Sequence, residues 1–115
     1  MKLHLVSCGL WTVLAVCADE ERCDVRDLAK GLRRDDPREY ARLMRAFAHG
    51  IFELKTSGGT RVLYFFDEGR VVVCSEALSK PKQRGLAVAI ERAARTRWRY
   101  LNDKRRGALR IVEDP

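Results

Sequence analysis

Cations stand beside two apolar stretches in the middle of the chain. Lys55 and Arg61 flank a glycine-containing turn, and the apolar run VLYF follows Arg61 directly. A second apolar run, VVVC, leads into Lys80 and Lys82. Apolar runs of this length predict strands, so we expect these cations to lie on a sheet. Cations on a sheet beside a basic helix suit a polyanion with reactive phosphates better than an apolar ligand.

Positive charge is concentrated in the last third of the chain. The formal net charge is +7, and residues 80–110 alone carry +9 while the remainder carries −2. Such asymmetry indicates an anionic macromolecule bound on one face, or an acidic protein partner. A solvated basic helix of a soluble protein would show the same charge. Charge alone therefore leaves these alternatives open.

Three motifs follow one another after residue 52. The run Glu53-Leu54-Lys55 precedes a glycine turn, Arg61 opens the VLYF run, and residues 78–84 form a basic segment that leads into the predicted last helix. In order and spacing these motifs resemble the ELR-type strand, the VLYF-type strand and the F-x-KK-type basic motif of RelE superfamily toxins of bacterial toxin–antitoxin pairs, especially the HigB-like branch. Lys55 stands where the family often has Arg, and Pro81 interrupts the usual Lys pair.

The resemblance spans roughly residues 11–102 and implies both a fold and a function. The implied fold is α+β, with a small antiparallel-rich sheet, an N-terminal helical hairpin and a C-terminal basic helix. Residues 1–115 would form one domain with a basic tail from about residue 103. The implied function is a cytoplasmic toxin that cleaves mRNA on the ribosome, without cofactor or membrane, and is silenced by a cognate helix-turn-helix antitoxin. A non-catalytic nucleic-acid or protein-binding module of the same fold is the alternative.

RNA brings its own nucleophile, the 2′-hydroxyl, so a ribonuclease must deprotonate it, neutralise the pentacoordinate phosphorane and protonate the leaving 5′-oxygen. Lys and Arg can do this without metal, because neighbouring positive charges lower the pKa of a lysine. The resemblance implies that Lys55 and Arg61 face Lys80 and Lys82 across a concave sheet surface. In this arrangement Arg61 holds the transition-state phosphate in its guanidinium fork. Lys80 or Lys82 acts as base or acid, and Lys55 positions a phosphate.

The basic helix supplies the expected RNA-binding surface. Its candidates are Arg84, Arg92, Arg95 and Arg99, of which the last three share one helix face by their spacing. Trp98 and Tyr100 in the same helix could stack on bases, although packing is the commoner fate of Trp. His4 and His49 are expected to be incidental. Glu76 could act as a base, although exposed carboxylates on strands are usually solvated.

Helix and strand signals give the order of elements. One helix is predicted from Asp24, with Asp24 as cap and Asp27 completing the capping pair, and a second from Asp36 and Pro37 to Gly50. Strands are predicted at about 51–56, 60–67 and 70–77. A last helix at about 84–102 has a predicted buried edge of Leu86, Ile90, Ala93, Arg97 and Leu101. Because VLYFF and VVVC are continuously apolar, we expect helices on both sheet faces.

The first eighteen residues allow two interpretations. They could be a short signal peptide, or Trp11–Ala18 could form the first strand at the edge of the sheet. We favour the strand, and a cytoplasmic location follows. The four cysteines show no C-x-x-C pair and no histidine at zinc-ligand spacing, so we predict reduced, structural thiols and no metal.

Overall fold

The computed structural model describes residues 1–48, 53–56 and 59–113. In chain order the elements are β1 (Lys2–Cys8), β2 (Thr12–Val16), α1 (Asp24–Asp35), α2 (Pro37–Ala48), β3 (Glu53–Lys55), β4 (Arg61–Asp67), β5 (Val71–Leu78), α3 (Gln83–Arg105) and β6 (Arg110–Val112). In these residues the strands form one sheet in the order β3-β4-β5-β2-β1-β6, with helices packed on it. The β2–β5 and β1–β6 pairs are parallel and the other pairs are antiparallel. The α+β prediction, with its helical hairpin and C-terminal helix, is confirmed.

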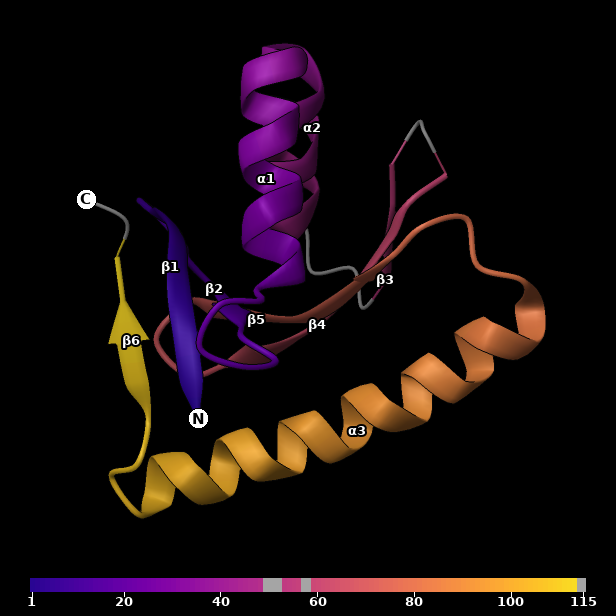
Figure 1. Ribbon diagram of the computed structural model, residues 1–115. Coiled ribbons are helices and arrows are strands. Elements are labelled where there is room, and N and C mark those ends of the chain that lie inside the picture. The colour runs from indigo at the N-terminus through magenta and orange to yellow at the C-terminus, as the bar shows by residue number, and fades with distance from the viewer. Residues whose placement is uncertain (49–52, 57–58, 114–115) are drawn as a thin grey trace.

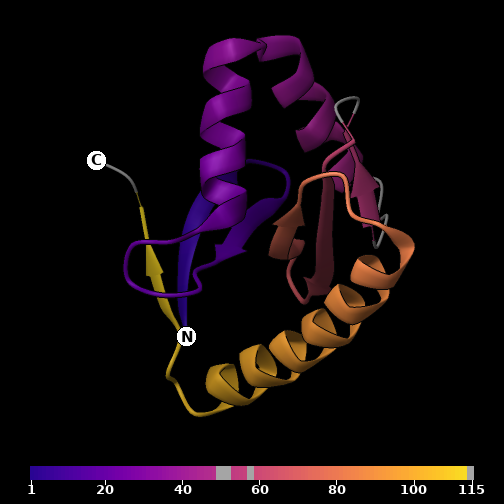
Figure 2. The ribbon, with the colours of Figure 1, turned by 45° about the vertical axis from the view of Figure 1, so that its right-hand side comes forward.

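Helices cover both faces of the sheet, as the continuously apolar strands predict. The α1–α2 hairpin stands on one side, and α3 runs along the other (Figures 1 and 2). Side chains alternate along β4, so Val62 and Tyr64 join the core that contains Val25 of α1. Leu63 and Phe65 point to the opposite face and pack with residues of α3. The predicted strands 60–67 and 70–77 end within one residue of β4 and β5.

Asp36 joins the two helices of the hairpin, as predicted. Its carboxylate accepts hydrogen bonds from the backbone N–H groups of Arg38 and Glu39 at 3.0 and 3.4 Å. Its own N–H donates to the carbonyl of Leu32 at 2.7 Å and closes α1. Pro37 is the first residue of α2, where its missing N–H costs nothing.

The predicted cap of α1 is wrong. The helix begins at Asp24, and Cys23 occupies the capping position without a side-chain hydrogen bond to the helix. Cys23 is fully buried, and its thiol donates to the carbonyls of Ala15 and Val16 at 3.6 Å. Packing against β2 therefore sets the start of α1. The predicted helix end at Gly50 and strand start at Ile51 lie outside the described residues.

The N-terminal segment forms two strands rather than one. β1 was not predicted, and β2 lies inside the sheet between β1 and β5 instead of at its edge. A register shift between Leu5 and Ser7 interrupts the alternation of β1. The polar His4 is buried in the middle of the strand. The register shift and the buried polar residue both disturb the alternation of apolar and polar residues by which a strand is recognised in a sequence. No helix in the described part of the chain is long and apolar enough to cross a bilayer.

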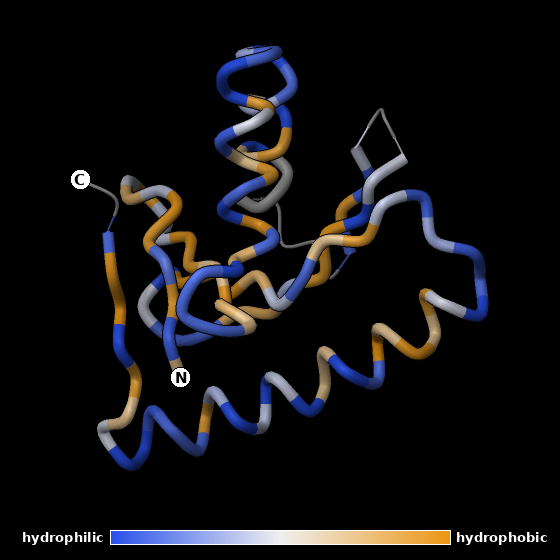
Figure 3. Tube along the Cα trace, in the orientation of Figure 1, coloured by the Kyte–Doolittle hydropathy of each residue, from blue (hydrophilic) through white to orange (hydrophobic). Residues whose placement is uncertain are grey.

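The predicted buried edge of α3 is confirmed in part. Ala93 is buried and Leu86 and Leu101 pack against the core, whereas Ile90 is 39% exposed and Arg97 is exposed. Ala89 and Tyr100 are the buried residues that were not predicted. Small alanines let the helix approach the sheet closely, and Tyr100 satisfies its hydroxyl by donating to a carboxylate of β4. Figure 3 shows hydrophobic positions recurring between hydrophilic turns along this helix. Ala89 and Tyr100 therefore take the place of Ile90 and Arg97 among the residues that anchor α3.

Candidate functional site

Lys55 and Arg61 are direct neighbours at one end of the sheet. They are paired residues of the antiparallel strands β3 and β4, and Arg61 is also paired with Leu78 of β5. Side chains of paired residues lie on the same face, about 5 Å apart at Cβ. Leu63, two residues after Arg61, packs against α3. Strand alternation therefore places both cations on the face that α3 covers.

Glu53 forms an ion pair with Arg61 on the same face. The Arg61 guanidinium donates to the Glu53 carboxylate, and the two side chains are 30% and 27% exposed. Glu53 is paired with Leu63, one step along the ladder from the Lys55–Arg61 pair. The carboxylate offsets part of the charge that a phosphate would meet at Arg61. In the sequence Glu53 belongs to the Glu53-Leu54-Lys55 run, and no local signal marks it as a partner of Arg61.

Lys80 reaches the same end of the sheet from the loop after β5. Its backbone has a positive φ of 43°, which is uncommon for a residue with a side chain. Gly59, in the turn after β3, has φ +85°, and a Cβ there would lie 3.1 Å from Cγ of Lys80. The Lys80 side chain thus lies against the turn that joins Lys55 to Arg61. These three predicted site residues are brought together.

Lys82 lies beside a hollow at the start of α3, which we call the α3 hollow. It is the residue before the first turn of α3 and is exposed. The first turn contains no acidic residue, so its free N–H groups add to the positive field. The hollow measures about 650 Å³ and combines an apolar floor with three cations. Its lining residues are Leu78, Ser79, Pro81, Lys82, Arg84, Gly85, Val88 and Arg92.

Arg92 is already engaged by a carboxylate. Its Nε and Nη2 donate to the two oxygens of Glu76 at 3.0 and 2.9 Å. This hydrogen-bonded charge raises the pKa of the Arg92 guanidinium. The Glu76 side chain is only 17% exposed, so the expectation of a solvated carboxylate is wrong. Glu76 is paired with Leu63 and therefore faces α3, because paired side chains share a face.

The predicted RNA-binding arginines are divided between two hollows and the solvent. Arg84 and Arg92 line the α3 hollow, whereas Arg92 and Arg99 line a second hollow of about 570 Å³ between α3 and the N-terminal strands. Arg95 is exposed and lines neither of these two hollows. The four arginines follow one helix but do not converge on one point.

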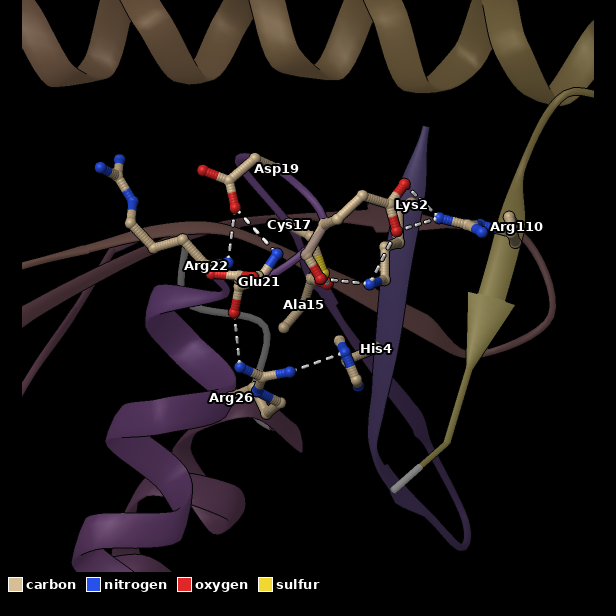
Figure 4. A network of polar contacts seen from close by, with 10 residues as sticks. Lys2, His4, Ala15, Cys17, Asp19, Glu21, Arg22, Arg26 and Arg110 are labelled. Atoms are coloured by element: carbon tan, nitrogen blue, oxygen red, sulfur yellow. Dashed lines mark hydrogen bonds and ion pairs between the residues drawn. The ribbon is translucent and has the colours of Figure 1, made fainter. Parts of the chain in front are cut away.

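The second hollow has a wall in which positive and negative groups are paired (Figure 4). The Glu20 carboxylate accepts hydrogen bonds from Arg110 at 2.6 Å and Lys2 at 3.3 Å, which lower its pKa. The Asp19 carboxylate accepts from the backbone N–H of Arg22 at 2.7 Å and of Glu21 at 2.9 Å, and these bonds lower its pKa. A wall neutralised in this way attracts a polyanion less than the α3 hollow does.

The described residues contain no group of three or more His, Cys, Asp or Glu side chains that could hold a metal ion. His4 is buried beside Arg26, with 2.8 Å between its Nε2 and the guanidinium Nη1 (Figure 4). His49 lies outside the described residues. Lys55, Arg61 and Lys80 are the predicted catalytic residues that the structure brings together.

A mixed sheet covered by a helical hairpin and a basic helix, with Lys55, Arg61 and Lys80 gathered at the end of β3 and β4, defines an α+β protein with a cationic end of its sheet. The family model described as Phage derived protein Gp49-like (DUF891) matches residues 17–98. The chain belongs to this family, which is a RelE/HigB-like toxin family of toxin–antitoxin systems. Membership implies an antitoxin partner. Comparisons with curated proteins and with solved structures gave no significant match.

Proposed function

We propose that this protein is the toxin of a toxin–antitoxin pair and a metal-independent endoribonuclease of the HigB-like branch. It cleaves mRNA in the cytoplasm, on the ribosome, and thereby inhibits translation. A helix-turn-helix antitoxin silences it. The observation that carries the proposal is the meeting of Lys55, Arg61 and Lys80 at one end of the sheet.

Each cation has a role in the proposed reaction. The 2′-hydroxyl attacks the adjacent phosphorus while Lys80 or Lys82 accepts its proton, and the other protonates the leaving 5′-oxygen. Arg61 stabilises the charge that develops on the phosphorane, and Lys55 holds a neighbouring phosphate. The products are a 2′,3′-cyclic phosphate and a 5′-hydroxyl. Arg84, Arg92, Arg95 and Arg99 bind the flanking RNA through their positive charge.

A non-catalytic binding module of the same fold remains the second candidate. One observation favours it: Glu53 already neutralises part of the charge of Arg61. In such a module the cations would bind an anionic partner without cleaving it. The two candidates differ in one product: the nuclease creates new RNA ends, and the binding module does not.

The proposal is tested by incubating the purified chain with mRNA, with and without ribosomes, in the presence of EDTA. We expect new fragments that end in a 2′,3′-cyclic phosphate and begin with a 5′-hydroxyl. Inducing the chain alone in bacteria should arrest growth and produce the same mRNA ends. Intact mRNA under all of these conditions would leave only the binding module.

A further inference from the structure

Trp98 is an exposed aromatic side chain in the middle of a basic surface. It lies on α3, and 68% of its surface is exposed. Arg95, Asn102 and Arg105 lie three, four and seven residues away and therefore share its face of the helix. We call these four residues the Trp98 patch. It faces away from the side of α3 where Ala89, Ala93 and Tyr100 are buried.

Trp98 does not pack into the hydrophobic core of this chain. Tyr100 satisfies its hydroxyl at Asp67, at 2.6 Å, whereas Trp98 belongs to neither the core nor a ring contact among the described residues. Within the same part of the chain, neither Arg95 nor Arg105 forms an ion pair with a carboxylate. An exposed indole beside unpaired guanidinium groups offers both an aromatic face and positive charge to a ligand.

These groups suit single-stranded RNA. An unpaired base can stack on the indole while its phosphates approach Arg95 and Arg105, and every base has a face that can stack. Bases in a duplex are already stacked and cannot reach the ring. A helical peptide would need several apolar anchors in successive turns. The other large exposed hydrophobic nearest to this position on α3, Ile90, lies eight residues away, or about 12 Å along the helix.

We propose that the Trp98 patch is a subsite for single-stranded RNA, in which Trp98 stacks on an unpaired base. The inference rests on the proposed function for the identity of the ligand, and it adds a second point of contact. Fourteen residues separate Arg84 in the α3 hollow from Trp98, which corresponds to about 21 Å along α3. RNA held at Trp98 can therefore run along the arginines of α3 toward the candidate cleavage site.

The test uses the full chain and an RNA whose 2′-hydroxyls are all methylated, so that binding is measured without cleavage. Trp98→Ala should weaken binding of the single strand about tenfold to a hundredfold, whereas Trp98→Phe should retain most of the affinity. Binding of a duplex of the same sequence should change by less than about twofold. Ile111→Ala, which removes another exposed apolar side chain from β6, should leave both affinities unchanged.

Two results would overturn the inference. One is wild-type binding of single strands by Trp98→Ala, and the other is an equal loss for duplex and single strand. If wild-type binding is accompanied by an altered oligomeric state of Trp98→Ala in sedimentation, the patch is a contact between copies of the chain. Stacking dependence without any cleavage of unmodified RNA would sustain the subsite and remove the nuclease. Cleavage of unmodified RNA, together with single-strand binding that does not depend on Trp98, would sustain the nuclease and remove the subsite.

Discussion

Arg61 is held by a carboxylate before any phosphate arrives. In the ion pair with Glu53, both side chains are partly exposed, so water screens the attraction. The phosphorane that forms during cleavage offers the guanidinium two oxygens in a fixed geometry and carries more negative charge than the carboxylate. Arg61 is therefore preorganised by Glu53 and remains available to a stronger anion.

Arg61→Ala should lower the rate of RNA cleavage by a factor of about 10² to 10³. This is the usual loss when one preorganised donor to a developing charge is removed. Circular dichroism and the melting temperature should stay close to wild type, because a partly exposed ion pair contributes little to stability. The measurement is single-turnover cleavage of mRNA, with growth after induction as a second readout.

Two further variants sharpen this prediction. Arg38→Ala removes an exposed cation of α2, far along the chain from the site, and should cleave like wild type. Glu53→Gln keeps the size of the side chain and removes its charge, and cleavage should persist because lysines supply the acid and base. Full activity in Arg61→Ala would contradict the proposed role, and loss of activity in Glu53→Gln would make Glu53 the base instead.

The adjacency of Lys55 and Arg61 could be predicted from the sequence, because a glycine turn between two strands pairs the residues that flank it. The position of Lys80 could not, since it depends on a left-handed backbone at Lys80 and on contact with Gly59. The ion pair of Glu76 with Arg92 could not be predicted from the sequence either. It depends on the register shift in the β4–β5 pair between Leu63 and Tyr64, which no local pattern reveals.

At the scale of elements, α3 is fixed to the sheet by a small polar cluster. Asp67, at the end of β4, accepts a hydrogen bond from the Tyr100 hydroxyl at 2.6 Å and from the Lys104 ammonium at 2.9 Å. The Asp67 side chain is 7% exposed. Burial raises its pKa, but the hydrogen bonds from Tyr100 and Lys104 outweigh this and hold the pKa below the ordinary value of 3.8.

Asp67→Asn should reduce the free energy of unfolding by about 1–3 kcal/mol near neutral pH, because charged hydrogen bonds are replaced by neutral ones. A carboxyl with a lowered folded-state pKa stabilises the fold above its ordinary pKa. That contribution is lost as the pH falls through the lowered value. The difference in free energy of unfolding between the variant and the wild type should therefore shrink below about pH 4. Urea unfolding at several pH values measures it, and a constant difference down to about pH 2 would refute the assignment.

The helical hairpin and the strands β4 and β5 were predictable because their signals are local. Asp36 and Pro37 mark a helix start by themselves, and VLYFF and VVVC are long apolar runs. β1 was missed because a bulge and the buried His4 disturb its pattern. The buried edge of α3 was predicted only in part, because Ala89 and Tyr100, rather than Ile90 and Arg97, face the sheet beside the predicted Ala93.

At the scale of the whole molecule, folding should not depend on disulfides. Cys23 and Cys74 are fully buried, and burial, with a smaller effect of neighbouring Cys17, raises the pKa of Cys23 to about 12. Burial also raises the pKa of Cys74. Both thiols stay protonated and unreactive at neutral pH. Thermal unfolding should coincide with and without reductant, and alkylation of the native protein should reach the exposed Cys8 first. A large loss of stability on reduction would contradict this.

The charge of the molecule should govern its binding to RNA. Residues 80–110 carry +9, and the cations of the α3 hollow and of the Trp98 patch belong to this region. Neutralising phosphates releases counterions, so affinity should fall about tenfold to a thousandfold between 50 and 200 mM salt. Arg95→Ala should reduce the slope of log affinity against log salt by about 0.7, the contribution of one phosphate contact on a single strand. Arg38→Ala should leave the slope unchanged. A flat salt dependence of wild-type binding would mean that the positive charge of α3 is only a solvated surface.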